Sequence, residues 1–341
     1  MRAAFVTAYG GPRVLEIRET AVPRLEPRQV LVKVRAFGLN FADIFSRLGV
    51  YPNNPKAPFI PGLECSGDIV AVGPEAQLFN GRERVMGYSR NGSHAEYVAI
   101  DERFVAHMPP SMTYEEGSAF LATYLSAYHG VVRLANLRKG EKLLVHAAAG
   151  GVGLATIQLA NHIGAEIFGT AGTDAKVALA RSQGAHHVIN YVTQDFSAEI
   201  LRITNGYGVD VVMDSVGGDV FRKSWHLLSQ MGRYVLFGVS AVAGKGALSR
   251  LKAAKVFSFM KPIFPPSLMS VNKAIFGFNL GTLTGKEEYF REAVTALMGL
   301  YEQGTLKPQI GKVFRFDEIV EAHRFLQTRR SMGKVVVLVN G

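Results

Sequence analysis

The sequence predicts an α/β protein in which a doubly wound parallel sheet is inserted into a β-rich domain made from both ends of the chain. Three observations predict this arrangement. The middle of the chain alternates short apolar segments with amphipathic ones, and a glycine-rich turn joins the first such pair. The flanking regions are rich in β-branched and alternating apolar residues. With 341 residues, 48% of them hydrophobic, the chain is long enough for two domains with cores of their own.

The elements follow in order along three predicted parts. The first part, residues 1–122, is expected to hold strands at 2–7, 14–17, 29–37 and 67–72, separated by Gly and Pro. The second part, residues 123–280, is expected to hold strands at 142–147, 166–170, 187–191, 209–214, 232–238 and 274–280, with helices between most of them. The third part, residues 281–341, is expected to return to the first domain with helices at 287–303 and 317–328 and strands at 312–316 and 334–339.

The glycine-rich turn follows the first apolar strand of the middle part. In a G-x-G-x-x-G turn the glycines allow a tight turn, a close approach of backbone to pyrophosphate, and close packing of helix on strand. Here Ala148, Gly150 and Gly153 hold the three positions, and Gly151 and Val152 begin the helix whose N-terminus faces the phosphates. The pattern predicts a Rossmann nucleotide site, and the alternative is an ordinary strand–turn–helix.

The next strand indicates which nucleotide is bound. NAD enzymes usually carry an acid about 20 residues after the glycine-rich turn, where it binds the ribose 2′-hydroxyl. This chain has Gly172 and Thr173 there, and its first acid, Asp174, comes late and is followed by Lys176. Without that carboxylate a 2′-phosphate is not repelled, so we predict NADPH. The alternative for Lys176 is a solvated lysine at the start of a helix.

Charge and composition limit the other functions. The net charge of +10 is carried by residues 220–286, which hold ten Lys or Arg and no acid. Such a field suits an anionic cofactor or an anionic membrane surface. A single cysteine, Cys65, and the lack of a long apolar run lead us to expect a cytoplasmic protein. Nucleic-acid motifs and a complete G-x-S-x-G hydrolase turn are absent from the sequence.

Several longer stretches resemble one family. Residues 140–158 resemble the signature of quinone oxidoreductases in the medium-chain dehydrogenase/reductase superfamily, although Asn161 departs from it. Residues 38–51, 61–64 and 209–218 fit as well, and the chain resembles most the synaptic-vesicle membrane protein branch. The resemblance implies a GroES-like catalytic domain around a Rossmann core and a homodimer joined through the last Rossmann strand.

The same resemblance implies catalytic residues. It places Asn40, Asp43 and Tyr51 near the nicotinamide. Asn40 would donate a hydrogen bond to substrate or cofactor, Asp43 would orient its neighbours, and Tyr51 would donate to the developing enolate. The alternative is that Asn40 and Asp43 only cap a helix and that Tyr51 lies in a turn.

Cofactor contacts also come from the resemblance, residue by residue. Arg329 is preferred to its neighbour Arg330 for the arginine that the family places at the cofactor. The full predicted set is Thr123, Ala148, Gly150, Gly151, Val152, Gly153, Gly172, Lys176, Tyr191, Phe237, Gly238, Phe278, Leu280 and Arg329.

Zinc is not expected. A catalytic zinc needs three side-chain ligands and an open position. Zinc-dependent relatives have a cysteine at the position of Asn40 and a histidine at that of Leu63, so neither ligand is present. Carbonyl polarisation must then come from hydrogen bonds or from the cofactor ribose, which favours soft acceptors.

Two functions remain open. The first is a zinc-free, NADPH-dependent reductase acting on quinones or α,β-unsaturated carbonyls with an apolar body. The second is a nucleotide-binding protein with little turnover that associates with lipid or membrane. The segment 245–278 separates them, because its bases and apolar residues predict either a cover over the substrate pocket or a membrane contact.

Overall fold

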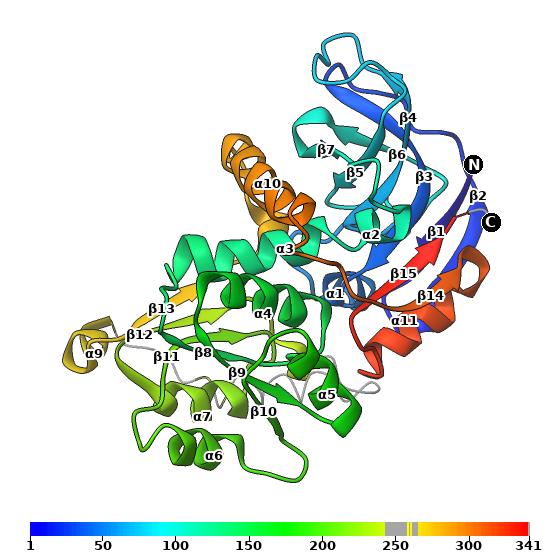
Figure 1. Cartoon of the computed structure of the whole chain (residues 1–341). Helices are drawn as coiled ribbons and strands as arrows, with labels where there is room; N and C mark the ends of the chain where they lie inside the picture. The colour runs from blue at the N-terminus through cyan, green and yellow to red at the C-terminus, as the bar shows by residue number, and fades with distance from the viewer. Residues whose placement is uncertain (243–257, 259, 261–264, 340–341) are drawn as a thin grey trace. The chain divides into compact units, whose positions relative to one another are not determined.

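The computed structural model describes residues 1–242, 258, 260 and 265–339, and it divides into two compact units (Figure 1). Unit 1 consists of Met1–Leu125 and Leu280–Gly341, and unit 2 consists of Ser126–Asn279. Both ends of the chain therefore belong to one unit. The limits of unit 2 fall close to the predicted limits at residues 123 and 280.

Unit 1 is built on a seven-stranded sheet in the order β14-β15-β3-β4-β5-β7, with β6 also paired to β3. The last strand, β15, pairs antiparallel with β3, and this pairing joins the C-terminal part to the N-terminal part. The strands of this sheet are β3 (Gln29–Leu39), β4 (Glu64–Val72), β5 (Arg84–Tyr88), β6 (Tyr97–Asp101), β7 (Val105–His107), β14 (Ile310–Arg315) and β15 (Lys334–Leu338). A separate pair consists of β1 (Arg2–Val6) and β2 (Leu15–Glu19).

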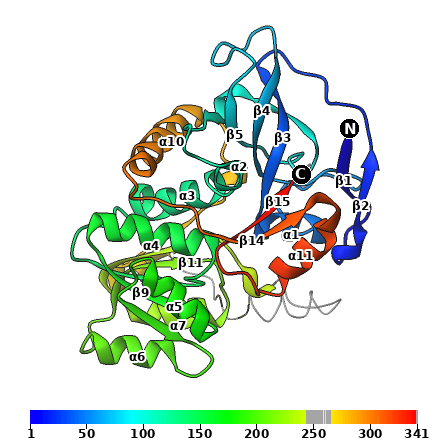
Figure 2. The same ribbon diagram turned by 45° about the vertical axis from the view of Figure 1, so that its right-hand side comes forward.

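Helices pack against this sheet: α2 contacts β3 and β4, and α11 lies beside β14 and β15 (Figure 2). Phe37, Ile44 and Val337, from β3, α1 and β15, belong to one buried core. The helices are α1 (Phe41–Leu48), α2 (Tyr114–Ser118), α3 (Leu121–Tyr128), α10 (Glu287–Glu302) and α11 (Ile319–Gln327). Short 3-10 turns are η1 (Pro12–Val14), η2 (Glu102–Phe104), η5 (Leu280–Thr282) and η6 (Phe316–Glu318).

Unit 2 is a doubly wound parallel sheet, as predicted. Its six strands run in the order β10-β9-β8-β11-β12-β13, all parallel, with α4 on one face and α6 and α7 on the other (Figure 1). The order reverses beside β8, and ligands of such sheets bind outside the carboxyl ends of the strands at this switch point.

The strands of unit 2 are β8 (Lys142–Val145), β9 (Glu166–Ala171), β10 (His187–Asn190), β11 (Val209–Asp214), β12 (Leu228–Leu236) and β13 (Ala274–Gly277). Its helices are α4 (Gly151–Ile163), α5 (Asp174–Ser182), α6 (Phe196–Ile203), α7 (Asp219–Leu227) and α9 (Pro265–Val271). The π-helix η3 (His129–Leu134) and the 3-10 turn η4 (Ser240–Val242) complete the set within the residues described.

The strands β5, β6 and β7 of unit 1 were not predicted, and several predicted strand limits differ from the observed ones, two of them in β12 and β13 of unit 2. The fifth strand, β12, begins at Leu228 instead of residue 232, and its pairing with β11 is irregular between these points, where Met231 has a φ of 62°. The sixth strand, β13, ends at Gly277, so that Phe278 leaves the sheet and Leu280 begins a 3-10 turn. The sequence could not show where this strand ends, because residues 274–280 are mostly apolar and a buried strand and an apolar turn have similar compositions.

The basic segment 245–278 is described only in part. The structure describes residues 258, 260 and 265–278 of it, with Met269 of α9 78% exposed. The remainder of the predicted cover lies outside the described residues. No helix in the described part of the chain combines the length and apolar character needed to cross a membrane.

Candidate active site

The glycine-rich turn of unit 2 joins β8 to α4 at the carboxyl edge of the sheet. Gly150 is the N-cap of α4 in an extended conformation, and the helix begins at Gly151. A Cβ on Gly153 would lie 2.5 Å from the backbone oxygen of Ala147 and 2.8 Å from that of Ala148. Glycine is therefore required here for the helix to pack against the turn, as the dinucleotide fingerprint demands.

The alanine at the first glycine position is accommodated by the neighbouring strand. Ala148 is fully buried, and its backbone N–H donates to the oxygen of Thr170 in β9 at 3.0 Å. A Cβ added to Gly169 would lie 2.9 Å from the Cβ of Ala148. Gly169 thus provides the space that the Ala148 methyl group occupies, and the turn keeps its close contact with β9.

The end of β9 lacks a free acid. Asp174, the first acid after the strand, accepts a hydrogen bond from the Asn190 side chain at 2.9 Å. Thr173 caps α5 by accepting from the backbone N–H of Lys176 at 3.3 Å, which fixes this lysine in the first helical turn. A Cβ on Gly172 would lie 2.6 Å from the Tyr191 hydroxyl, so these two predicted residues lie side by side.

The carboxyl ends of β12 and β13 bring the other predicted unit 2 residues together. The rings of Phe237 and Phe278 stack with centroids 5.7 Å apart, and His129 packs edge-on against Phe278 at 4.8 Å. Gly238 lies against Ser215, whose backbone a Cβ at position 238 would meet at 3.0 Å. These residues line the same edge of the sheet as the glycine-rich turn.

In unit 1, Asn40 belongs to a buried polar cluster that the sequence did not reveal. The ammonium of Lys334 donates to Asn40 Oδ1 at 2.7 Å and to Glu64 Oε1. The Asn40 amide donates to Glu64 Oε1 at 3.0 Å and to the Gly38 oxygen at 3.3 Å. The second Glu64 oxygen accepts from the Ala122 backbone at 2.9 Å. Both hydrogens of the Asn40 amide thus have acceptors within unit 1.

Asp43 holds the start of α1. Its carboxylate accepts the backbone N–H of Asn40 at 2.7 Å, which is the helix-capping role given above as the alternative. Burial raises the pKa of Asp43 to about 7, although the Asn40 N–H and the Lys334 charge oppose this shift. His94 Nε2 lies 3.8 Å from the carboxylate, and burial lowers the His94 pKa to about 3, so this ring is neutral.

The raised pKa of Asp43 makes stability depend on pH. The folded protein retains a proton on Asp43 that the unfolded chain, with a pKa near 3.8, releases between about pH 4 and 7. Stability therefore falls as pH rises through this window, by up to about 1.4 kcal/mol per pH unit. Urea denaturation of the parent and of Asp43→Asn at pH 5 and pH 7 measures this effect. The free energy of unfolding of the parent, relative to that of the variant, should be lower at pH 7 than at pH 5. A difference between the two proteins that is the same at both pH values would contradict this prediction.

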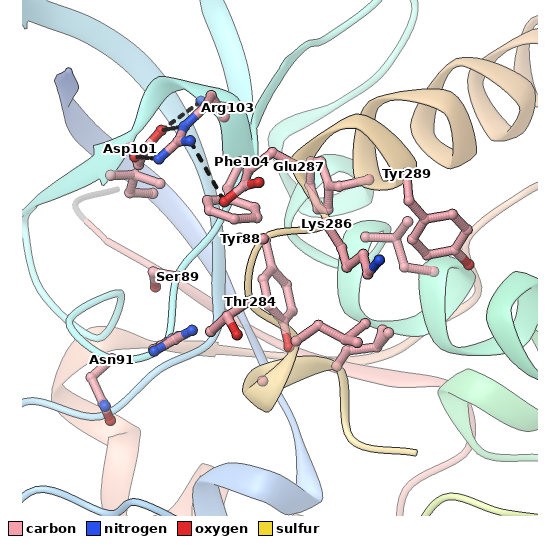
Figure 3. A pocket seen from close by; sticks show the side chains of 18 of the residues that line it. Tyr88, Ser89, Asn91, Asp101, Arg103, Phe104, Thr284, Lys286, Glu287 and Tyr289 are labelled. Atoms are coloured by element: carbon pink, nitrogen blue, oxygen red, sulfur yellow. Dashed lines mark hydrogen bonds and ion pairs between the residues drawn. The ribbon is translucent and has the colours of Figure 1, made fainter. Parts of the chain in front are cut away.

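A cavity of about 550 Å³ opens in unit 1 between β5, the turn after β6, and the residues leading into α10 (Figure 3). Its walls are largely apolar and include Ile100, Phe104, Leu125, Leu283 and Phe290. Its volume is in the range of sites for small organic ligands. The acids at its margin are engaged, because Arg103 binds Asp101 at 2.7 Å and Glu287 at 3.5 Å.

Tyr88 connects this cavity to the polar cluster. It is the last residue of β5, it pairs in register with Glu64, and its side chain lines the cavity (Figure 3). Burial raises the pKa of Tyr88 well above its usual value, and the charges of Tyr51, Glu64 and Asp43 add to this shift. Tyr51, predicted as a donor, therefore lies near enough to Tyr88 to influence it.

The other predicted unit 1 residues have different surroundings. Thr123 is buried, and its hydroxyl donates to backbone oxygens of its own helix, at 2.6 Å to Ala119 and 3.1 Å to Phe120. Leu280 lines the cavity. Arg329 is exposed, in a left-handed conformation with φ 57°, and follows Thr328, the C-cap of α11.

Sequence reasoning missed Lys334, Glu64 and Tyr88. Lys334 carried one signal in the sequence, because it is a charged residue that begins an otherwise apolar strand. The structure shows that it is only 4% exposed. Glu64 lies in a stretch noted only for its resemblance. Tyr88 carried no signal, since aromatic residues are ordinary in strands.

No group of three or more His, Cys, Asp or Glu side chains suited to a metal ion occurs among the described residues. Leu63, at one of the positions discussed for zinc, is buried and 6% exposed. The oxygens of Asn40 and Glu64 converge on the Lys334 ammonium, which already supplies a positive charge at this point.

Comparisons with known proteins agree with this architecture. Residues 26–110 match the family model described as alcohol dehydrogenase GroES-like domain, and residues 183–337 match the one described as zinc-binding dehydrogenase. The parallel sheet with its glycine-rich turn and the β-rich unit define a medium-chain dehydrogenase/reductase.

Individual relatives specify the family. The synaptic vesicle membrane protein VAT-1 homolog of Rattus norvegicus is 37% identical over 99% of this chain and 84% of its own length. The human quinone oxidoreductase is 33% identical over 99% of this chain and 98% of its own. The crystal structure of Escherichia coli quinone oxidoreductase complexed with NADPH superposes with a TM-score of 0.88 at 28% identity, covering 99% of this chain and 100% of that one. The chain belongs to the quinone oxidoreductase family of the medium-chain dehydrogenase/reductases, which includes the VAT-1 homologs.

Proposed function

We propose that this protein is a metal-independent oxidoreductase that uses NADPH to reduce a quinone or an α,β-unsaturated carbonyl compound. The observation that carries the proposal is the dinucleotide turn of unit 2, with glycine at positions where a Cβ would strike backbone. The apolar cavity of unit 1 supports the choice of substrate, because quinones and enones are conjugated carbonyls with apolar bodies. The NADPH complex of the Escherichia coli relative supports the choice of cofactor.

The residues of unit 2 fit a dinucleotide. The backbone N–H groups of Gly151, Val152 and Gly153 begin α4 and would hold the pyrophosphate. Gly172, Lys176 and Tyr191 would hold the adenosine phosphate, and Phe237, Gly238 and Phe278 the nicotinamide half. The predicted contacts of Thr123, Leu280 and Arg329 remain part of the proposal. When bound, NADPH supplies a hydride.

The chain's own residues would prepare the site for charge on the substrate oxygen. Lys334 and Glu64 fix the Asn40 amide, and Asp43 fixes the backbone of Asn40. In this proposal Asn40 and Asp43 orient the site rather than transfer protons. A zinc ion does not fit these donors, because the ammonium of Lys334 lies between the two oxygens that could face it.

The resemblance to quinone oxidoreductases also implies an oligomeric state. We propose a homodimer, and the position of β13 at the edge of the unit 2 sheet supports it, since this strand has one side open to pairing within the described residues. A cytoplasmic location stays a prediction.

The cofactor proposal predicts that NADPH binds more tightly than NADH and that Lys176→Ala removes most of this preference. A charged contact to phosphate contributes about 1.5–3 kcal/mol, so we expect the variant to lose about tenfold in NADPH affinity and little in NADH affinity. Calorimetric titration of both nucleotides measures this. Lys139→Ala, which changes an exposed lysine of the same unit, is the matched control. Equal affinities of the parent for both nucleotides would refute the cofactor assignment.

A further inference from the structure

We propose that Tyr88 is the residue of the unit 1 cavity that donates a hydrogen bond to the substrate's carbonyl oxygen, and that the cavity takes a flat, ring-conjugated carbonyl compound such as a bicyclic quinone. The inference rests on the proposed function and names the substrate class and a catalytic residue for it.

The hydroxyl of Tyr88 is available for a ligand. Within the described residues it makes no hydrogen bond, and its side chain lines the cavity (Figure 3). Other tyrosines of the chain donate hydrogen bonds from their hydroxyls within the fold. For example, Tyr114 donates to Asp68 at 2.5 Å and Tyr234 donates to Asp214 at 2.7 Å. Tyr88 is half-buried, and a tyrosine hydroxyl with no protein partner at a cavity wall points to a ligand that enters the cavity and accepts its hydrogen bond.

The surroundings of Tyr88 favour a donor over a base. Burial and the neighbouring Tyr51, Glu64 and Asp43 raise its pKa, while Arg90 opposes the shift. The phenol therefore keeps its proton at neutral pH. Its O–H group can donate a hydrogen bond that becomes stronger as negative charge develops on the acceptor oxygen. An interaction that is stronger in the transition state than in the ground state accelerates the reaction.

The balance of the reaction fits this role. The substrate gains a hydride, its carbonyl oxygen receives the displaced electron pair, and NADPH becomes NADP⁺. A proton from solvent then completes a hydroquinone from a quinone or a saturated ketone from an enone. Tyr88 retains its own proton throughout, so it stabilises the anion without being consumed.

The aromatic lining of the cavity favours ligands with rings. Phe290 packs against Tyr88 with centroids 6.4 Å apart and edge-on against Phe104 at 5.3 Å, which makes an aromatic wall. The hydroxyl of Ser89, which also lines the cavity, already donates a hydrogen bond to the Gly62 backbone oxygen at 3.1 Å. A flat conjugated ligand would bury its faces against aromatic and aliphatic side chains and present its oxygen to Tyr88.

The test compares Tyr88→Phe with the parent, using menadione as the bicyclic quinone. We expect kcat/KM for menadione to fall about 100-fold, as for loss of one oxyanion donor, with NADPH affinity within twofold of the parent. Tyr9→Phe is the matched control in the same unit, since its hydroxyl binds only the Pro55 oxygen at the surface. Tyr51→Phe tests the donor predicted from the sequence. Parental kinetics in Tyr88→Phe would overturn the proposal.

A second readout does not depend on turnover. The infrared carbonyl stretch of menadione bound to the NADP⁺-loaded protein should lie at lower frequency in the parent than in Tyr88→Phe. If the parent binds menadione with this shift but does not reduce it, the proposed function fails while the Tyr88 contact stands. If menadione does not bind, or its stretch is the same in both proteins, the Tyr88 inference fails whatever the activity.

Discussion

Replacing Lys334 by methionine is expected to lower the free energy of unfolding by about 3–5 kcal/mol, because it leaves Glu64 as a buried, unpaired charge. The Lys334 side chain is 5% exposed and that of Glu64 is fully buried, and the pair also holds the Asn40 amide. Removing one partner of such a pair exposes the full cost of burying the other. Urea denaturation of the parent and the variant measures the difference.

Matched variants separate the pair from its surroundings. The double variant Lys334→Met with Glu64→Gln carries no unpaired charge, so it should recover most of the lost stability. Arg315→Met breaks an exposed pair with Glu318 and should cost less than about 1 kcal/mol. A loss for Lys334→Met no larger than for Arg315→Met would show that the buried pair contributes little.

Replacing Gly153 by alanine is expected to weaken NADPH binding by at least about tenfold, equivalent to 1.4 kcal/mol. The new Cβ would lie 2.5 Å from the Ala147 oxygen and 2.9 Å from the Ala148 carbonyl carbon. These are backbone atoms, so the turn itself must move, and the N–H groups at the start of α4 move with it.

The shift in melting temperature on adding NADPH measures this loss, since a ligand stabilises only the state that binds it. Gly299→Ala is the control, because a Cβ at that helical position meets no atom within 4 Å. An NADPH-induced shift in Gly153→Ala as large as in the parent would contradict the role given to the turn.

Local patterns predicted the strands of unit 2 and the nucleotide turn, because these depend on residues adjacent in the chain, whereas β5, β6 and β7 of unit 1 were not predicted. The step from β8 through Gly150 to α4 can be read from one short stretch. The replacement of glycine by Ala148 could not be interpreted in the same way, since the space for its methyl group comes from Gly169 on another strand.

The polar cluster could not be predicted from local patterns, because its residues are far apart in the sequence. Lys334 meets Asn40 across 294 positions and Glu64 across 270, and the pairing of β3 with both β15 and β4 brings the three residues together. The sequence suggested Asn40 as a donor to substrate, whereas the structure gives both of its amide hydrogens acceptors inside unit 1. The free hydroxyl at the cavity wall belongs instead to Tyr88, which only the arrangement of β4, β5 and α10 reveals.

The measurement that tests the central claim most directly is hydride transfer from labelled NADPH. Incubation with NADPH carrying deuterium on either face of C4 and an aryl enone should yield, from one of the two labels, a saturated ketone with one deuterium on its β-carbon. NADP⁺ should form in equal amount, and treatment with a zinc chelator should leave the rate unchanged. A protein that binds NADPH but transfers no label to any enone, and oxidises it with no quinone, would contradict the account and favour a nucleotide-binding protein without turnover.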